Sequence, residues 1–237
     1  MSHASSKDIF TDRVYYYLLT YGILPSGNKY NIENLKEKID KIYLYYEELL
    51  EWNKKINLTT VTDIDGFIKK HVIDSSYLLK ILNAGGYILD IGSGAGFPGM
   101  IIEILMPDLK IISIESVLKK CNFQKNAARK LDLNNFKCLN VNIFNYKDYE
   151  GVTAIVTRAA FNAEEIGRLI ENIDLKNGTD IYLFLSKTEE AKKIESFKYK
   201  SKRAILDKTL YYKTDYSNSK NDDFRLIAKF KIINNFK

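Results

Sequence analysis

The sequence predicts an α/β protein built on a mainly parallel, doubly wound sheet, with a helical extension at the N-terminus and antiparallel pairing at the C-terminal edge. Three observations carry this prediction. An apolar run over residues 87–91 leads directly into a glycine-rich turn. Strand-like and helix-like segments then alternate as far as residue 194, which is typical of βαβ units. The last two strand-like segments, 202–210 and 224–233, have no helix between them, so we expect them to pair in antiparallel.

The first part of the chain has the periodicity of helices. Segments 8–21 and 31–52 are predicted to be helical, because apolar and tyrosine side chains recur in the second one at spacings of three and four residues. A third helix is predicted over 63–82, with Asp63 or Asp65 as its N-cap.

The α/β part follows without a linker of low complexity. Strands are predicted over residues 87–91, 110–115, 136–139, 152–157, 180–185, 202–210 and 224–233. Helices are predicted over residues 97–105, 118–131, 163–173 and 188–194. We therefore divide the chain into a helical extension over residues 1–82 and one compact α/β domain over residues 83–237, on which the extension packs.

Composition and charge narrow the class of protein. The 237 residues are 46% hydrophobic and carry a net charge of +6, which suits one globular core and favours a polyanionic partner. A lysine-rich composition from an AT-biased genome is the alternative explanation of the charge. Neither a bilayer-spanning stretch nor a signal-peptide core is found, so we expect a cytoplasmic location. Cys121 and Cys138 have no metal-ligand spacing, so we expect core residues and no metal.

A glycine-rich loop carries the first chemical signal. Gly92, Gly94 and Gly96 allow a strand to turn sharply into a helix while the backbone passes close to a ligand. The Gly-Lys-Ser/Thr of a P-loop is missing. The carboxylate of Asp90, just before the glycines, would repel a dinucleotide pyrophosphate but suits a cofactor with a positive sulfonium and an amino group. The loop therefore favours a sulfonium cofactor.

Glu115 is the second candidate ligand-binding residue. It ends the second predicted strand, 25 residues after Asp90. A carboxylate at this place can accept both ribose hydroxyls of an adenosine. A surface acid beside the next helix is the alternative interpretation.

Five short blocks lie in series over residues 52–161. They are 52–59 (Trp-Asn-Lys-Lys-Ile-Asn-Leu-Thr), 70–75 (Lys-His-Val-Ile-Asp-Ser), 90–99 (Asp-Ile-Gly-Ser-Gly-Ala-Gly-Phe-Pro-Gly), 115–120 (Glu-Ser-Val-Leu-Lys-Lys) and 157–161 (Thr-Arg-Ala-Ala-Phe). Together they resemble the RsmG (GidB) family of bacterial rRNA methyltransferases. The resemblance implies a class I S-adenosylmethionine-dependent methyltransferase fold, which the order of strands fits better than a hydride-transferring dehydrogenase.

The resemblance also implies an activity and a cofactor site. The family transfers a methyl group from S-adenosylmethionine to N7 of a guanine in 16S rRNA. The cofactor-binding positions that match are Gly92, Ser93, Gly94, Gly96, Phe97, Glu115, Ile143, Phe144 and Arg158. Phe144 stands where the family commonly has an acid, so ring stacking or backbone groups would replace a side-chain hydrogen bond to adenine.

The substrate side is defined less sharply. Guanine N7 carries no proton in the neutral base, so we assign no catalytic acid or base. His71 is expected either to contact RNA or to support the cofactor loop together with Asp74. RNA candidates are Lys69, Lys70, Lys119, Lys120, Lys187 and Arg158, of which Arg158 could instead bind the cofactor carboxylate. For any single lysine the alternative is a solvated helix face. We expect a monomer that binds 16S rRNA or a precursor of the small ribosomal subunit.

Three other functions compete with this interpretation. A methyltransferase of another RNA site or of a protein would have the same cofactor loop. A non-catalytic RNA-binding module would keep the fold without the cofactor, which a titration with S-adenosylmethionine would reveal. A dehydrogenase comes third, and NADH fluorescence would test it.

Overall fold

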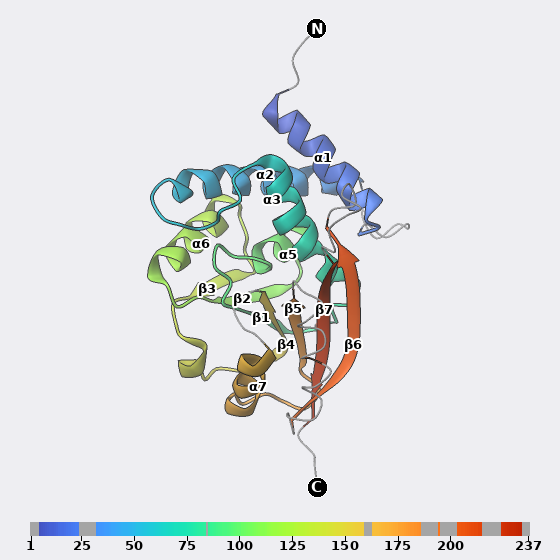
Figure 1. Ribbon diagram of the computed structural model, residues 1–237. Helices are drawn as coiled ribbons and strands as arrows, with labels where there is room; N and C mark the ends of the chain where they lie inside the picture. The colour runs from blue at the N-terminus through green and yellow to red at the C-terminus, as the bar shows by residue number, and fades with distance from the viewer. Residues whose placement is uncertain are drawn as a thin grey trace.

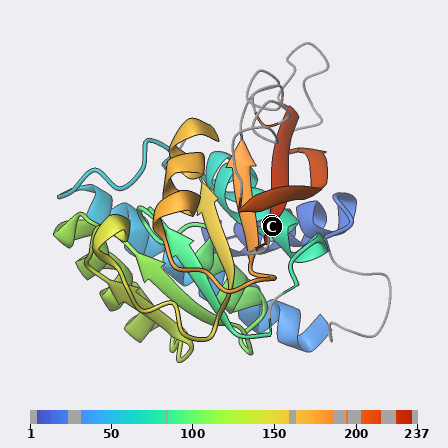
Figure 2. The same cartoon turned by 90° about the horizontal axis from the view of Figure 1, so that it is seen from below.

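The computed structural model describes residues 5–23, 32–83, 85–158, 163–185, 194, 203–214 and 224–233. Within them a central sheet has seven strands in the order β3-β2-β1-β4-β5-β7-β6. The strands are β1 (Tyr87–Ile91), β2 (Lys110–Ile114), β3 (Phe136–Leu139), β4 (Val152–Arg158), β5 (Asp180–Leu185), β6 (Ala204–Lys213) and β7 (Phe224–Ile232). Figure 1 shows the sheet at the centre of the molecule, and Figure 2 shows it from below.

The pairing of the strands confirms the predicted topology. Strands β3, β2, β1, β4 and β5 are parallel to one another. β7 runs antiparallel to both β5 and β6. The last strand of the chain therefore lies inside the sheet, and β6 forms the edge.

Helices connect the parallel strands. In the α/β part they are α5 (Gly99–Leu105), α6 (Leu118–Lys130) and α7 (Ala163–Asn172), with a short 3-10 helix, η3, over Ile143–Asn145. The N-terminal part contains α1 (Ser6–Thr20) and α2 (Ile32–Asn53). The helix predicted over 188–194 lies outside the described residues except for Ile194.

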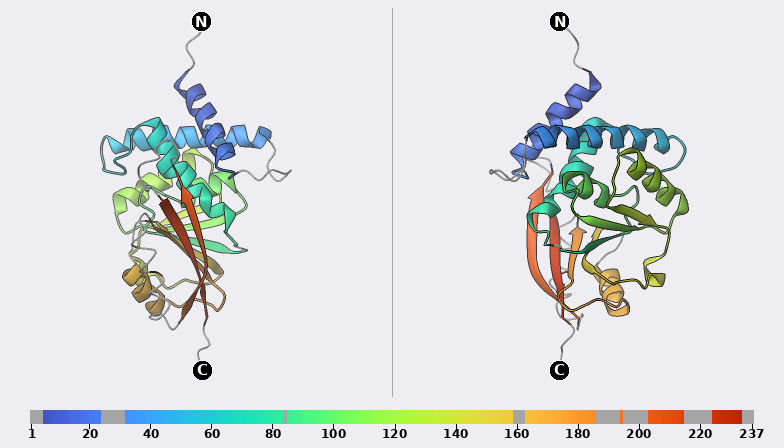
Figure 3. Two further views of the ribbon diagram at one scale, coloured as in Figure 1. Left: turned by 45° about the vertical axis from the view of Figure 1, so that its right-hand side comes forward. Right: turned by 180° about the vertical axis from the view of Figure 1, so that it is seen from behind.

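The two faces of the sheet are buried in separate hydrophobic clusters. Successive residues of β1, Ile88 and Leu89, are both fully buried but belong to different clusters, as expected where side chains alternate between the faces. The cluster with Ile88 includes α1, α2, α5 and α6, so the N-terminal helices share the core of the α/β part. The cluster with Leu89 includes α7, and Figure 3 shows α1 and α2 at one end of the molecule and α7 at the other.

The third predicted helix is a composite. One turn of α-helix, α3 (Ile64–Phe67), continues as a π-helix, η1 (Ile68–Ile73), then as α4 (Asp74–Ser76) and as a 3-10 helix, η2 (Tyr77–Lys80). Of the two predicted caps, Asp63 is the N-cap, because its Oδ1 accepts a hydrogen bond from the Gly66 amide at 2.7 Å. π-helical turns occur frequently at functional sites, and this one carries His71.

Close packing of α5 on the sheet requires glycine at the first position of the helix. A Cβ atom on Gly99 would lie 2.7 Å from Asp90 Oδ2 and 2.9 Å from Ile111 Cγ2.

We expect Gly99→Ala to lower the free energy of unfolding by about 1–3 kcal/mol, the usual cost of overpacking. Gly85→Ala is the matched control, since a Cβ there meets nothing within 4 Å. Equal urea midpoints for the two variants would contradict the prediction.

Candidate functional site

The glycine loop lies at the carboxyl edge of the parallel strands, where β1 ends between β2 and β4. The chain passes from β1 to β2 on one side and later from β3 to β4 on the other side of β1, so this is the topological switch point where open α/β sheets bind ligands. Gly92, Gly94 and Gly96 have φ angles of 68°, 61° and 99°. These left-handed values explain why the chain uses glycine at the three positions.

Glu115 closes one side of this loop. Its Oε2 accepts a hydrogen bond from the Gly94 amide at 2.9 Å, and its Oε1 accepts one from the Val117 amide at 2.8 Å. The residue is only 5% exposed, so it is not a surface acid. Each carboxylate oxygen retains a lone pair for a further donor.

Asp90 lies beneath the loop and is fully buried. Its Oδ2 accepts a hydrogen bond from the Gly99 amide at 2.8 Å, whereas its Oδ1 has no partner among the described residues. Burial raises the pKa of Asp90 to about 7, although the Gly99 amide and Arg158 oppose the shift. Within the described part of the chain, Glu103 Oε2 and Asp180 Oδ1 are also buried without a hydrogen-bond partner, so what distinguishes Asp90 is its position at the end of β1, just before the glycine loop.

Asp74 accepts hydrogen bonds from three side chains that lie much later in the sequence. Its Oδ2 is 2.9 Å from Arg158 Nη1, and its Oδ1 is 3.1 Å from Arg225 Nη1 and 2.7 Å from the hydroxyl of Tyr212. Asp74 is 1% exposed, so its contacts with the two guanidinium groups are needed to offset the loss of hydration. Sequence reasoning missed Tyr212 and Arg225, because nothing local marks them.

His71 connects this cluster to the glycine loop. Its Nδ1 lies 3.1 Å from Arg158 Nη2, and because a guanidinium only donates, Nδ1 is the acceptor. The proton is therefore on Nε2, which donates to Thr59 Oγ1 at 3.1 Å. The imidazole stacks on Phe97 with ring centroids 4.2 Å apart. Burial and the neighbouring Arg158 lower the pKa of His71 to about 2, so the ring is neutral.

Contacts from the block over residues 52–59 and from α2 reach His71 and the glycine loop. Asn53 Oδ1 accepts hydrogen bonds from the Leu58 and Thr59 amides, which fixes the turn after α2 and brings Thr59 to His71. From the same helix, the buried hydroxyl of Tyr45 donates to the carbonyl of Ala95 inside the loop. The extension thus supports the loop directly.

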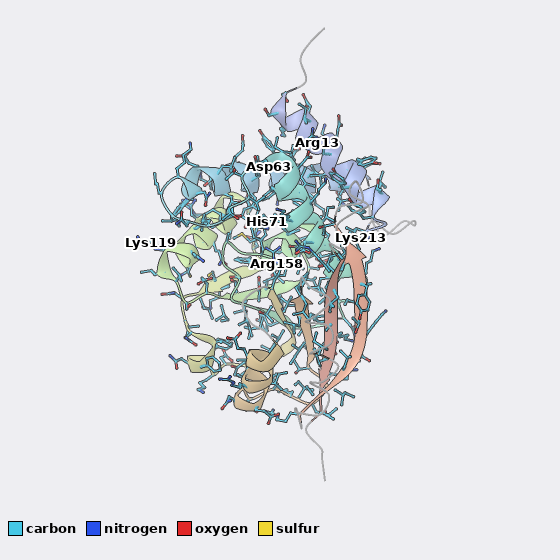
Figure 4. The ribbon with its side chains drawn as sticks, in the orientation of Figure 1. Arg13, Asp63, His71, Lys119, Arg158 and Lys213 are labelled. Carbon is cyan, nitrogen blue, oxygen red and sulfur yellow. The ribbon has the colours of Figure 1, made fainter. Side chains whose placement is uncertain are left out.

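The other candidate residues are distributed around this centre. Figure 4 shows His71 and Arg158 close together, with Lys119 on α6 well apart from them. Ile143 is buried in η3, whereas Phe144 beside it is 47% exposed. Lys69 and Lys70 lie in η1 next to His71, and Lys120 follows Lys119 on α6. Lys187 lies outside the described residues.

Solved structures of other proteins share this fold. M. jannaschii TYW2 in complex with AdoMet superposes with a TM-score of 0.54 at 12% identity, covering 76% of this chain and 80% of that chain. A SAM-dependent methyltransferase from Aquifex aeolicus gives 0.54 at 16% identity, with 70% and 93% coverage. The fold is therefore that of class I methyltransferases, as predicted.

Relatives found by sequence are more similar to this chain in sequence than these solved structures are. A ribosomal RNA small subunit methyltransferase G from Mycoplasma capricolum is 33% identical over 169 residues, which are 70% of this chain and 72% of the relative. One from Geobacter sp. (strain M21) is 45% identical over 104 residues, so the match spans about half of that relative (48%) and 44% of this chain. Residues 38–215 match the family described as GidB, rRNA small subunit methyltransferase G. Because this match extends over most of the chain, the protein belongs to that family.

Proposed function

We propose that this protein transfers the methyl group of S-adenosylmethionine to N7 of a guanine in 16S rRNA, acting as a cytoplasmic monomer. The observation that carries the proposal is the glycine loop of β1 closed by Glu115, in a chain that belongs to a family of small-subunit rRNA methyltransferases. An RNA-binding module without cofactor chemistry would not need to keep this loop and acid together.

Three features of the site fit S-adenosylmethionine. A Cβ atom on Gly94 would meet nothing within 4 Å, so the backbone there faces open space. The lone pairs of Glu115 that remain free suit the ribose hydroxyls. The unpartnered Oδ1 of Asp90 suits a positively charged donor such as the amino group of the cofactor. The other members of the proposed binding site are Gly92, Ser93, Gly96, Phe97, Ile143, Phe144 and Arg158.

Methyl transfer to guanine N7 requires alignment of the reacting atoms and no proton transfer. When bound, the cofactor supplies a methyl group activated by its sulfonium. The N7 lone pair of guanine attacks without losing a proton, so the protein needs no general base. Accordingly, neutral His71 has both nitrogens committed, one to Arg158 and one to Thr59. The role proposed for it is to orient Arg158 rather than to move a proton.

The net charge of +6 supports the RNA partner, since phosphate contacts by lysine and arginine dominate the affinity for nucleic acids. Lys69 and Lys70 are the preferred contacts, because η1 places them beside His71. Lys119 and Lys120 lie farther along the same carboxyl edge, at the start of α6. None of the helices in the described ranges is long and apolar enough to cross a bilayer.

The product of the reaction tests the proposal. Unmodified small-subunit rRNA or 30S subunits are incubated with the protein and methyl-labelled S-adenosylmethionine, then digested to nucleosides. We expect the label in 7-methylguanosine at one position of 16S rRNA. Label on a cytosine carbon, on a ribose oxygen or on protein would contradict the proposed acceptor.

Substitution of glutamine for Glu115, which replaces one carboxylate oxygen by an NH2 group, tests the cofactor site. In Glu115→Gln the charge is lost and an NH2 group faces the amides of Gly94 or Val117, so acceptors are replaced by donors. We expect the Kd for S-adenosylmethionine to rise about 10- to 100-fold, corresponding to about 1.5–3 kcal/mol for hydrogen bonds to a charged group. Glu150→Gln, in an exposed turn, is the control. Titration calorimetry on folded protein with equal affinities for both variants would exclude Glu115 from the site.

The charge of His71 gives a test that depends on pH. The pKa of His71 is about 2 in the folded protein and about 6.5 in the unfolded chain. Between these two pH values the unfolded chain binds a proton at His71, whereas the folded protein does not. His71 therefore reduces stability as the pH falls through this window. In NMR spectra of a His3→Gln variant, we expect the remaining imidazole signals to stay constant from pH 8 to 5. A titration with a midpoint near 6.5 would show that the ring is free to charge.

A further inference from the structure

Behind the glycine loop lies a closed ring of three polar side chains. Ser93 Oγ is 2.6 Å from Ser113 Oγ, Ser113 Oγ is 2.7 Å from Gln124 Oε1, and Gln124 Nε2 is 2.8 Å from Ser93 Oγ. The three residues come from the loop, from β2 and from α6. Ser113 and Gln124 have no exposed surface, and Ser93 is 4% exposed.

The direction of every hydrogen bond in the ring is determined by one neighbour. Gln124 Nε2 also lies 2.8 Å from the carbonyl oxygen of Gly94, which only accepts. The amide nitrogen must therefore face the loop, and its two hydrogens go to Ser93 Oγ and to this carbonyl. Ser113 then donates to Gln124 Oε1, and Ser93 donates to Ser113.

Gly94 is thereby held from both sides. The peptide group before it is fixed by the bond from its N–H to Glu115, and the peptide group after it is fixed by the bond from Gln124 to its carbonyl. A Cβ atom on the Cα between these two peptide groups would meet nothing within 4 Å. Because glycine loses more conformational freedom on ordering than any other residue, a loop that is fixed in advance binds its ligand at a lower entropic cost.

We propose that Gln124 is a positioning residue for the cofactor, which holds the Gly94 carbonyl so that the glycine loop has its binding shape before the ligand arrives. The inference rests on the proposed function, because it assigns the loop to S-adenosylmethionine. Gln124 lies outside the loop, yet by this proposal it affects the affinity for the cofactor. A purely structural residue would affect only the stability of the fold.

Two variants of the same ring make the test. Gln124→Met keeps the length of the side chain but removes the donor to Gly94. Ser113→Ala also breaks the buried ring, yet leaves that donor in place. We expect Gln124→Met to raise the Kd for S-adenosylmethionine about tenfold or more, measured by titration calorimetry, and Ser113→Ala to raise it less than about threefold. With saturating rRNA, the KM for the cofactor should rise in Gln124→Met while kcat stays near that of the original chain.

Exchange of the Gly94 amide hydrogen in ligand-free protein gives an independent readout. We expect faster exchange in Gln124→Met than in Ser113→Ala at equal global stability, because the loop opens locally when its carbonyl is released. The positioning role would be overturned if both variants lost affinity in proportion to their loss of melting temperature. An unchanged Kd in Gln124→Met would overturn it as well. Either result leaves the proposed function standing as long as the original chain binds S-adenosylmethionine. If the original chain does not bind it, the proposed function fails, and the exchange rates alone decide whether Gln124 holds the loop.

Discussion

The site depends above all on the buried carboxylate of Asp74. It stands in the N-terminal part of the chain, but its three donors come from β4, β6 and β7. Removal of a buried carboxylate would leave the guanidinium groups of Arg158 and Arg225 without their counter-charge, which costs far more than a surface ion pair. The same contact fixes the position of Arg158 relative to His71, and through His71 that of Phe97 in the loop. The helical extension is therefore part of the site.

Charge balance explains why His71 has to be neutral. Arg158, Arg225 and Asp74 together carry one net positive charge, and a protonated imidazole 3.1 Å from Arg158 would add a second one in a poorly solvated place. Two acidic side chains, Asp90 and Glu115, contact the loop and the start of α5, and a cationic ligand would lower the pKa of Asp90 from the value of about 7 that burial gives it. A cofactor with a positive sulfonium is compatible with this distribution, because the acids attract it and Asp74 screens the arginines.

The sequence predicts the sheet well and the site only in part. The bounds of β1, β3 and β5 agree with the predicted segments, because short apolar runs bounded by turns are readable locally. The glycines and Glu115 are also readable, since strand, turn and acid follow one another closely in the chain. The π-helical turn within residues 64–80 is not, because its side-chain pattern resembles that of an ordinary helix. Tyr212 and Arg225 lie 138 and 151 residues from Asp74, so only the folded chain reveals their contact.

Gln124 shows a second limit of sequence reasoning and a general property of the loop. On a helix such as α6 a glutamine is normally a solvent-facing residue, yet this one is fully buried, because each of its polar atoms has a partner. Tyr45 from α2 and Glu115 after β2 bind the same loop. Three separate elements thus restrain a segment that its glycines would otherwise leave free. Flexible residues give the backbone its close approach to a ligand, and polar side chains from the surrounding core remove the disorder that such residues bring.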